Sequence, residues 1–274
     1  MDEQPAIQDS STAFALPPIQ GHLMFKDVNF AYVPNRPVLK HNSFEALPGQ
    51  KIGLCGPTGA GKSTLINLIT RYYDIDSGDI LIDGYSLYDV RKDSLRQQIG
   101  IVLQEPFLFS DTVMNNLRYA RLDATEKVCI EAAKQANTHE FIERLPNGYD
   151  TLLAKRGSNL SQGQGQGQLL TIARMMVQNP RLVILDEATS NVDTRTEQHI
   201  QEALTRLMAG RTSFVIAHRL STIRDSDQNL VLKSGEIVER GTHDSLMQQQ
   251  GLYHELYMSQ FKGKLAVVTG NVLP

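Results

Sequence analysis

Eight consecutive residues constrain this chain more than any other part of it. Gly56-Pro57-Thr58-Gly59-Ala60-Gly61-Lys62-Ser63 matches the phosphate-binding pattern G-x-x-x-x-G-K-[S/T]. The motif stands between an apolar run at 51–55, predicted to be a buried strand, and an apolar helical run at 65–69. Such a loop turns its backbone N–H groups around phosphates, and the following helix directs its positive end at the same anion. The sequence therefore predicts a nucleotide phosphate site within an α/β arrangement.

Lys62 and Ser63 supply the side chains of this predicted site. A lysine at this position reaches the β- and γ-phosphates, and the serine hydroxyl coordinates Mg²⁺. Gly59 and Gly61 supply the backbone freedom that the loop needs. The alternative is a glycine-rich turn with a chance lysine, but four fixed positions arise by accident in only about one percent of chains this long. ATP and Mg²⁺ are the expected ligands.

A second apolar run, at 181–185, ends in the two carboxylates of Asp186 and Glu187. Alone, such a pair is more often an ordinary solvated strand end. In a chain with a phosphate-binding loop, Asp186 suits the water shell of Mg²⁺ and Glu187 suits the base that orients or deprotonates the attacking water. His218 follows the next apolar strand and is a candidate contact for the γ-phosphate or the water, although a lone histidine there is more often structural.

The composition excludes several partners and kinds of site. With 27 basic and 30 acidic residues the net charge is −3, which gives no electrostatic footprint for nucleic acid or an anionic membrane surface. Cys55 and Cys129 lack metal-ligand spacing, which argues against a zinc site or a disulfide framework and fits a reducing cytoplasm. No run approaches the roughly 18 apolar residues of a membrane span. Any membrane link is therefore expected to come through a partner.

The rest of the pattern predicts mixed strands and helices. Residues 1–20 are rich in Asp, Gln, Ser and Pro without a period, so they predict a linker, with ordered structure from about Gly21. Alternating apolar residues from Leu23 predict antiparallel strands. Further predicted elements are helical segments at 126–145 and 194–208, strands at 182–185 and 213–217, and a hairpin of 229–233 with 236–239 around Ser234-Gly235.

Taken in order, the motifs resemble the series found in ATP-binding-cassette (ABC) nucleotide-binding domains, over about residues 21–260. The resemblance is carried by Tyr32, 56–64, Gln104, Leu160-Ser161-Gln162-Gly163-Gln164, Leu185-Asp186-Glu187-Ala188-Thr189-Ser190, Asn191-Val192-Asp193 and Ala217-His218-Arg219-Leu220-Ser221-Thr222. It implies an α/β P-loop NTPase (RecA-like) core with an antiparallel β subdomain and an inserted α-helical subdomain. The implied division is a linker at 1–20, a core at 21–87 and 175–261, a helical signature subdomain at 88–174 and a tail at 262–274.

The resemblance also implies roles for residues outside the loop. Tyr32 is expected to stack on adenine, with Val38 against the base or ribose. Gln104 looks like the Gln-loop residue, which contacts Mg²⁺ and water and senses the transmembrane subunit. The implied nucleotide contacts are Tyr32, Val38, Gly56, Thr58, Gly59, Ala60, Gly61, Lys62, Ser63, Thr64, Gln104, Ser161, Gly163, Gln164 and Asp193. The implied catalytic residues are Glu187, His218, Lys62 and Gln104, and the implied metal ligands are Ser63, Gln104 and Asp186.

Several details resemble exporters rather than importers or soluble repair and translation ATPases. The segments at 104–110 and 187–193 look like those of exporter half-transporters. This implies transmembrane domains preceding residue 1, a place at the cytoplasmic face of the cell membrane, and a multidrug or lipid-like substrate. Ser161 and Gly163 would face ATP held by an opposite subunit in a head-to-tail dimer. Gln162, where the family usually has Gly, resembles the altered signature of one subunit in heterodimeric multidrug exporters, so the expected partner is a different nucleotide-binding domain.

The stretch from Ser161 to Arg174 is two residues longer than the family spacing, and removing one Gly-Gln pair restores it. Two extra residues rotate a helix by roughly 200° and lengthen it by about 3 Å, so either the excess loops out or the signature shifts. Gly165 and Gly167 would weaken the first helical turns by about 1 kcal/mol each relative to Ala. Two hypotheses remain: the signature docks poorly on a partner's γ-phosphate, or the Gly-rich stretch forms a tolerant loop.

Three functions fit the sequence. The first is an ATPase motor that closes with a second domain when ATP binds and reopens on hydrolysis. The second is a nucleotide-dependent association module that hydrolyses weakly because its signature is altered. The third is a small P-loop kinase, which is disfavoured because no arginine lid for a substrate phosphate is evident and the signature segment would have no role.

Overall fold

The computed structural model describes residues 7–154, 163–186, 192–217 and 219–269, with side chains described for 7–154, 165–186, 192–217 and 219–260. Contacts between Cα atoms divide the chain into two compact units. Unit 1 comprises residues 1–95 and 214–274, and unit 2 comprises residues 96–213. The subdomain boundaries expected at 87/88 and 174/175 stay a prediction.

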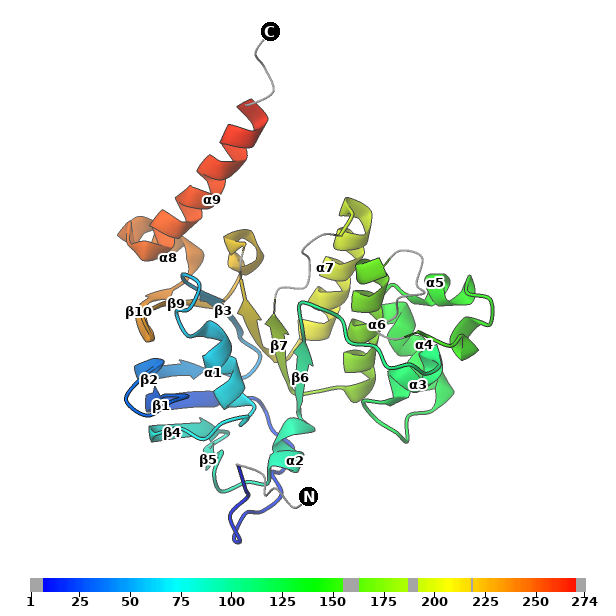
Figure 1. Cartoon of the computed structure of the whole chain (residues 1–274), viewed down its shortest axis with the longest axis horizontal. Helices are drawn as coiled ribbons and strands as arrows, with labels where there is room; N and C mark the ends of the chain where they lie inside the picture. Colours follow the sequence, from blue (N-terminus) through cyan, green and yellow to red (C-terminus); the bar gives the residue numbers. More distant parts are fainter. Residues whose placement is uncertain (1–6, 155–162, 187–191, 218, 270–274) are drawn as a thin grey trace. The chain divides into compact units, whose positions relative to one another are not determined.

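Unit 1 contains an antiparallel sheet with the strand order β2-β1-β4-β5 (Figure 1). Its strands are β1 (Leu23–Phe30), β2 (Leu39–Ala46), β4 (Ser77–Ile82) and β5 (Tyr85–Ser86). Leu23 and Phe25 of β1 are buried and alternate with more exposed residues, which is the pattern of a strand with one face on the core. The rings of Phe25 and Phe44 stack with centroids 4.5 Å apart across the β1–β2 pair. The predicted antiparallel strands from Leu23 are therefore confirmed.

A second group of strands in unit 1 carries the phosphate-binding loop. β3 (Lys51–Cys55) runs parallel to β9 (Gln228–Lys233), which pairs antiparallel with β10 (Glu236–Gly241). The hairpin turn has positive φ at both central residues, 52° at Ser234 and 88° at Gly235, as a tight two-residue β-turn requires. The predicted strand at 51–55 and the predicted hairpin are both confirmed.

The described part of unit 1 also contains helices. They are α1 (Lys62–Ile69), α2 (Lys92–Arg96), η3 (Leu220–Ile223), α8 (His243–Gln249) and α9 (Leu252–Thr269). α2 ends at the boundary with unit 2. α9 is a helix of 18 residues that continues past residue 262, where the tail was predicted to begin. In Figure 1 this helix is the last coloured element of the chain.

The described part of the predicted linker packs against the rest of unit 1. Leu16 and Ile19 are buried, and the Leu16 N–H donates to Ser94 Oγ at 2.9 Å. Phe14 exchanges backbone hydrogen bonds with the segment before α2: its N–H donates to Asp89 O and its carbonyl accepts from Arg91 N–H. The segment is ordered because its few apolar side chains are spaced to reach the core, a feature that its polar composition conceals. As a connection to a further domain it stays a prediction.

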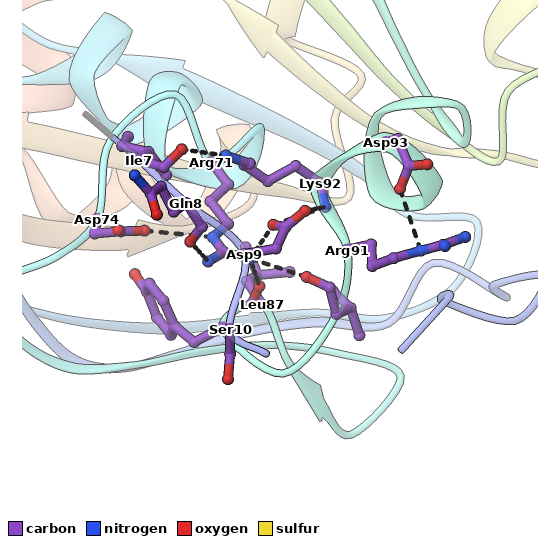
Figure 2. Close-up of polar contacts among 12 residues, drawn as sticks. Ile7, Gln8, Asp9, Ser10, Arg71, Asp74, Leu87, Arg91, Lys92 and Asp93 are labelled. Atoms are coloured by element: carbon purple, nitrogen blue, oxygen red, sulfur yellow. Dashed lines mark hydrogen bonds and ion pairs between the residues drawn. The ribbon is translucent and has the colours of Figure 1, made fainter. Parts of the chain in front are cut away.

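Arg71, two residues beyond the end of α1, ties this N-terminal segment to the rest of unit 1 (Figure 2). Its side chain is only 3% exposed. Nη1 donates to Leu87 O at 2.8 Å and Val90 O at 2.9 Å, and the same nitrogen lies 3.4 Å from Asp9 Oδ1. Nε lies 3.3 Å from Asp74 Oδ1. The buried guanidinium thus satisfies two backbone carbonyls and balances two carboxylates at once.

Replacing Arg71 with methionine is expected to lower the free energy of unfolding by about 2 kcal/mol, because two buried carbonyls lose their donor and Asp9 loses its anchor. Arg91→Met is the matched control: Arg91 is 51% exposed and its Nε lies 3.6 Å from Asp93, an exposed pair that contributes little. Urea denaturation of both variants measures the difference. Equal losses would show that the network around Arg71 is no stronger than a surface ion pair.

Unit 2 combines a parallel strand pair with helices. The strands are β6 (Ile99–Val102) and β7 (Leu182–Asp186), and β8 (Thr212–Ile216) begins in this unit and ends in unit 1. The helices are α3 (Val113–Arg118), α4 (Glu126–Gln135), α5 (His139–Glu143), η1 (Gly148–Asp150), α6 (Gly163–Gln178) and α7 (Thr194–Met208). The predicted helix at 194–208 is confirmed. The helical segment at 126–145 is two helices, because the chain turns at Asn137, where φ is 56°.

The Gly-rich stretch lies in α6, a helix of 16 residues that runs without a break from Gly163. The hypothesis of a tolerant loop is therefore wrong for residues 163–168. A Cβ on Gly165 would lie 2.5 Å from Thr196 Cγ2 of α7, and one on Gly167 would lie 3.1 Å from Pro106 Cγ. The missing side chains let α6 pack closely on its neighbours, and α6 and α7 lie side by side (Figure 1). No excess residue loops out within 163–178.

The mixed α/β class with an antiparallel sheet and a helical part is confirmed. Within the parts of the chain that the structure describes, no helix combines the length and the apolar character needed to cross a membrane.

Candidate functional site

The predicted phosphate-binding loop connects β3 to α1 in unit 1. Gly56, Gly59 and Gly61 have φ values of 140°, 79° and 105°, all in the left-handed region that favours glycine. Gly61 is the N-cap of α1 and offers no side-chain acceptor, and the first turn of α1 has no acidic residue. The N-terminus of this helix therefore favours an anion.

The side chain of Lys62 folds back over the phosphate-binding loop. Its side chain is almost buried, and Nζ donates to Gly56 O at 2.8 Å and Pro57 O at 3.0 Å. These two carbonyls hold the ammonium group at the loop, where it can meet a phosphate without a large rearrangement. The positive charge of Lys62 would then neutralise part of the negative charge on the β- and γ-phosphates.

A hollow of about 260 Å³ opens at this loop. It is lined by Val38, Thr58, Gly59, Gly61, Lys62, Ser63, Thr64 and Ile216. All of these except Ile216 were expected to contact the nucleotide, and Ile216 is the last residue of β8, a strand expected only to support His218. Gly56 and Ala60 do not line this hollow, because Gly56 packs against Leu232 of β9 and Ala60 is buried behind the loop.

The turn between β9 and β10 supports the loop, a contact that the sequence did not reveal. Gly235 N–H donates to Ala60 O at 3.2 Å, and Gly235 O accepts from Lys40 N–H at 2.9 Å and from Asn42 Nδ2 at 2.8 Å. A Cβ on Gly235 would lie 2.3 Å from Val38 O. The hairpin was recognisable from Ser234-Gly235, but its partners lie nearly 200 positions earlier, where local patterns carry no signal.

Cys55 lies beside the loop and forms part of a second hollow, of about 190 Å³, together with Leu256 and Gln260 of α9. Burial raises the pKa of the Cys55 thiol to about 12, although the nearby Lys62 charge acts to lower it. The thiol therefore stays protonated at neutral pH and is a structural rather than a reactive group.

Tyr32 follows β1 and is 46% exposed, so part of its surface is open to a ligand. Its hydroxyl donates to Thr64 Oγ1 of α1 at 3.2 Å and accepts from Asn67 Nδ2 at 3.3 Å. The expected adenine contact and the phosphate-binding helix are thus joined directly within unit 1. Asn67 and the neighbouring Tyr73 were not identified from the sequence, because neither belongs to a recognised motif.

In unit 2, two of the predicted metal ligands follow neighbouring strands. Gln104 is exposed just after β6, and Asp186 is the last residue of β7. β6 and β7 run parallel, with Val102 opposite Leu185, so the two side chains leave the sheet at the same edge. Amide and carboxylate oxygens, like the Ser63 hydroxyl in unit 1, are donors that Mg²⁺ prefers. The residue types expected to hold Mg²⁺ therefore fit this ion.

Asp193 has a structural role that its motif did not predict. It is the N-cap of α7, where its carboxylate accepts from Thr196 N–H at 3.0 Å. This backbone hydrogen bond lowers the pKa of Asp193 below its ordinary value. Its expected contact with the nucleotide stays a prediction.

Several expected residues lie outside the described parts of the chain. These are Ser161, Glu187 and His218. Gly163 and Gln164 are the first two residues of α6, and only their backbone is described. The roles expected for all five stay predictions.

Comparisons with known proteins agree with this geometry. A family model described as "ABC transporter" matches residues 39–190, more than half of the chain. Over 262 residues the chain is 52% identical to the uncharacterized ABC transporter ATP-binding protein YfiC of Bacillus subtilis (strain 168) and 48% identical to the ATP-dependent lipid A-core flippase of Syntrophus aciditrophicus (strain SB). Each match covers 96% of this chain and 43% of the relative, so the chain spans less than half the length of these proteins.

Two further similarities concern a transporter and an exporter structure. The chain is 49% identical over 241 residues to the fatty acid ABC transporter ATP-binding/permease protein of Mycobacterium tuberculosis (strain CDC 1551 / Oshkosh), a match that covers 88% of this chain and 38% of that protein. Among solved structures it resembles a bacterial Atm1-family ABC exporter with ATP bound, with a TM-score of 0.85 and 42% identity. That match covers 93% of this chain and 44% of the exporter chain.

Proposed function

The chain belongs to the ABC transporter family, and on that basis we propose that it is the ATP-hydrolysing motor of an exporter. It is an ATP-binding domain of the exporter type, and such domains are ATPases. The observation that carries the proposal is the loop at 56–63, which brings Lys62 and three left-handed glycines to the N-terminus of α1. Membership of this family excludes the small P-loop kinase.

In the proposed reaction, water attacks the γ-phosphorus of ATP and the bond from this phosphorus to the oxygen of ADP breaks. Lys62 neutralises charge on the β- and γ-phosphates, and Glu187 accepts the proton of the attacking water. Ser63, Gln104 and Asp186 would hold Mg²⁺, which supplies positive charge to the phosphate oxygens. His218 would contact the γ-phosphate or the water. Tyr32 and Val38 would receive the adenine and ribose.

The proposed working unit is a dimer with a second nucleotide-binding domain, closed by ATP and reopened by hydrolysis. Ser161, Gly163 and Gln164 would face the nucleotide of the opposite domain. The start of α6 at Gly163 supports this role, because the N-terminus of a 16-residue helix favours an anion. Gln162 in place of the usual Gly supports a heterodimer, in which the partner supplies the standard signature.

We further propose that this motor acts on transmembrane domains at the cytoplasmic face of the cell membrane. The proposed transported substrate is a drug-like compound, as in multidrug exporters, or a lipid-like compound. The lipid-like alternative is supported by the names of two relatives, a lipid A-core flippase and a fatty acid transporter.

The second candidate function is a nucleotide-dependent association module with weak hydrolysis. It is favoured by Gly165 and Gly167 in the first turns of α6, since each costs about 1 kcal/mol in helix stability relative to Ala. A signature held on a weakened helix end would dock poorly on a partner's nucleotide. Phosphate release with a partner that has a standard signature separates the two functions: efficient turnover supports the motor, and tight dimerisation without turnover supports the association module.

The experiment that tests the motor is Mg²⁺-dependent phosphate release from ATP at increasing protein concentration. A rate that rises more than linearly is expected, because the active species is a dimer. Lys62→Ala should lower it about 100-fold, since the charge on the β- and γ-phosphates loses its counterion. Lys26→Ala, an exposed change in β1, is the control and should leave the rate unchanged. Absence of Mg²⁺-dependent ATP binding would contradict the proposal.

A further inference from the structure

Tyr32 is held by two aromatic rings that the phosphate-binding motif does not include. The ring of Phe30 lies with its centroid 4.8 Å from that of Tyr32 at an interplanar angle of 84°. The ring of Tyr73 lies 4.9 Å away at 87°. Both are edge-to-face arrangements, which are favourable for aromatic pairs at these distances. Tyr73 comes from the segment after α1, about forty positions further along the chain.

The hydroxyl end of the same ring is fixed from α1. Thr64 Oγ1 accepts the hydroxyl hydrogen and Asn67 Nδ2 donates to the hydroxyl oxygen, at 3.2 and 3.3 Å. The ring is therefore held at its sides by Phe30 and Tyr73 and at its tip by Thr64 and Asn67. These contacts leave it 46% exposed, so it keeps surface for a ligand.

Such a clamp matters because Tyr32 lies in a loop between β1 and β2 rather than in a strand. An unrestrained side chain must lose its rotamer freedom when a base stacks on it, and that loss weakens binding. The contacts around Tyr32 restrict this freedom within the fold itself. Phe30 is buried in the core beneath the loop, so the exposed part of the clamp is Tyr73.

We propose that Tyr73 is a positioning residue of the adenine site: it holds the Tyr32 ring in the orientation that receives the base. This inference rests on the proposed function, in which Tyr32 stacks on adenine. Tyr73 acts through Tyr32 and has no effect on the phosphates, which are bound by the loop at 56–63. It therefore contributes to the preference for ATP over a bare triphosphate.

The test compares Tyr73→Leu with the wild-type chain, using adenylyl imidodiphosphate and inorganic tripolyphosphate as probes, both with Mg²⁺. We expect Tyr73→Leu to weaken binding of the adenine nucleotide about 3–10-fold, the worth of one aromatic contact, and to leave tripolyphosphate binding unchanged. The KM for ATP should rise by the same factor while kcat stays within about twofold. Tyr73→Phe keeps the ring and should behave as wild type.

Tyr85→Leu is the matched control. It removes a similar edge-to-face contact, with Phe14 at 5.6 Å, from an exposed tyrosine of β5 in the same unit. It should change neither affinity. In a Tyr32→Ala background, Tyr73→Leu should have no further effect on nucleotide binding, because the ring that it positions is gone. If Tyr73→Leu does not fold, Asn67→Ala tests the clamp from the other end, with an expected loss of about threefold.

Equal loss of affinity for both probes, or a further loss in the Tyr32→Ala background, would overturn the inference. So would wild-type behaviour of Tyr73→Leu in a chain that binds both probes normally, and that result would leave the proposed function intact. Failure of the wild-type chain to bind either probe would overturn the proposed function as well.

Discussion

Glu187→Gln is expected to reduce phosphate release about 1000-fold while ATP still binds. The change keeps the size and shape of the side chain and removes the carboxylate proposed to accept a proton from the attacking water, a contribution of about 10²–10⁴ in rate. ATP affinity should change less than about threefold, because the proposed nucleotide contacts are the loop at 56–63 and Tyr32, which the change leaves intact. Single-turnover phosphate release and equilibrium binding of ATP measure the two effects separately.

Glu140→Gln is a matched control for that prediction, since it makes the same chemical change on an exposed face of α5, where Glu140 pairs with Arg144. It should leave hydrolysis unchanged. If Glu187→Gln retained more than a tenth of the wild-type rate, Glu187 would not be the base, and the assignment of the strand-end carboxylates would need revision. Accumulation of an ATP-bound dimer in the Glu187→Gln variant would support the role of hydrolysis in reopening it.

Gly56→Ala is expected to abolish useful ATP binding and to lower the free energy of unfolding by about 4 kcal/mol. Gly56 has φ of 140°, and a Cβ at this position would lie 2.1 Å from Leu232 O and 3.0 Å from Leu232 C. These are backbone atoms of β9, which pairs with β3, so no side chain can move to make room. The loop would have to leave its position between β3 and α1.

Three other glycines separate this steric effect from the strain of a positive φ. Gly59 has φ of 79°, and a Cβ there would have no atom within 4 Å, whereas at Gly61 the nearest atom, at 2.7 Å, belongs to the flexible Leu39 side chain. Gly84→Ala, at φ of 84° in open space away from the loop, measures the cost of positive φ alone. The expected order of destabilisation is Gly56 largest, then Gly61, then Gly59 and Gly84. Melting temperatures and ATP affinity check the order, and equal effects at Gly56 and Gly84 would contradict the steric explanation.

Much of the fold was predictable because its signals are local. The strand at 51–55, the helix at 194–208 and the hairpin around Ser234-Gly235 each follow from a short periodic pattern or a turn pair. The loop at 56–63 was predictable for the same reason, since its glycines and Lys62 act within eight residues. The break at Asn137 was not predicted, because the pattern of apolar residues around it is helical and does not show that one residue adopts the left-handed conformation.

The Gly-rich start of α6 shows where local reasoning left two alternatives open. Two glycines near a helix end favour a loop by propensity, yet the chain is helical from Gly163. Thr196 leaves no room for a Cβ on Gly165, and Pro106 would have to shift for one on Gly167, so close packing offsets part of the intrinsic cost of glycine. Residues 7–19 are ordered for a similar reason: Leu16 and Ile19 are buried in the core, and Asp9 pairs with the buried Arg71.

The amino-acid sequence by itself identifies the candidate site residues: a phosphate-binding loop, a predicted strand followed by two carboxylates, and the order of motifs that marks an ABC nucleotide-binding domain. The contacts that support these and neighbouring segments are evident only from the folded structure. Gly235 under the loop, Asn67 and Tyr73 around Tyr32, and Arg71 beneath the N-terminal segment all act across long separations in sequence. These contacts arise from packing and hydrogen bonding between segments that fold together, which no local pattern specifies.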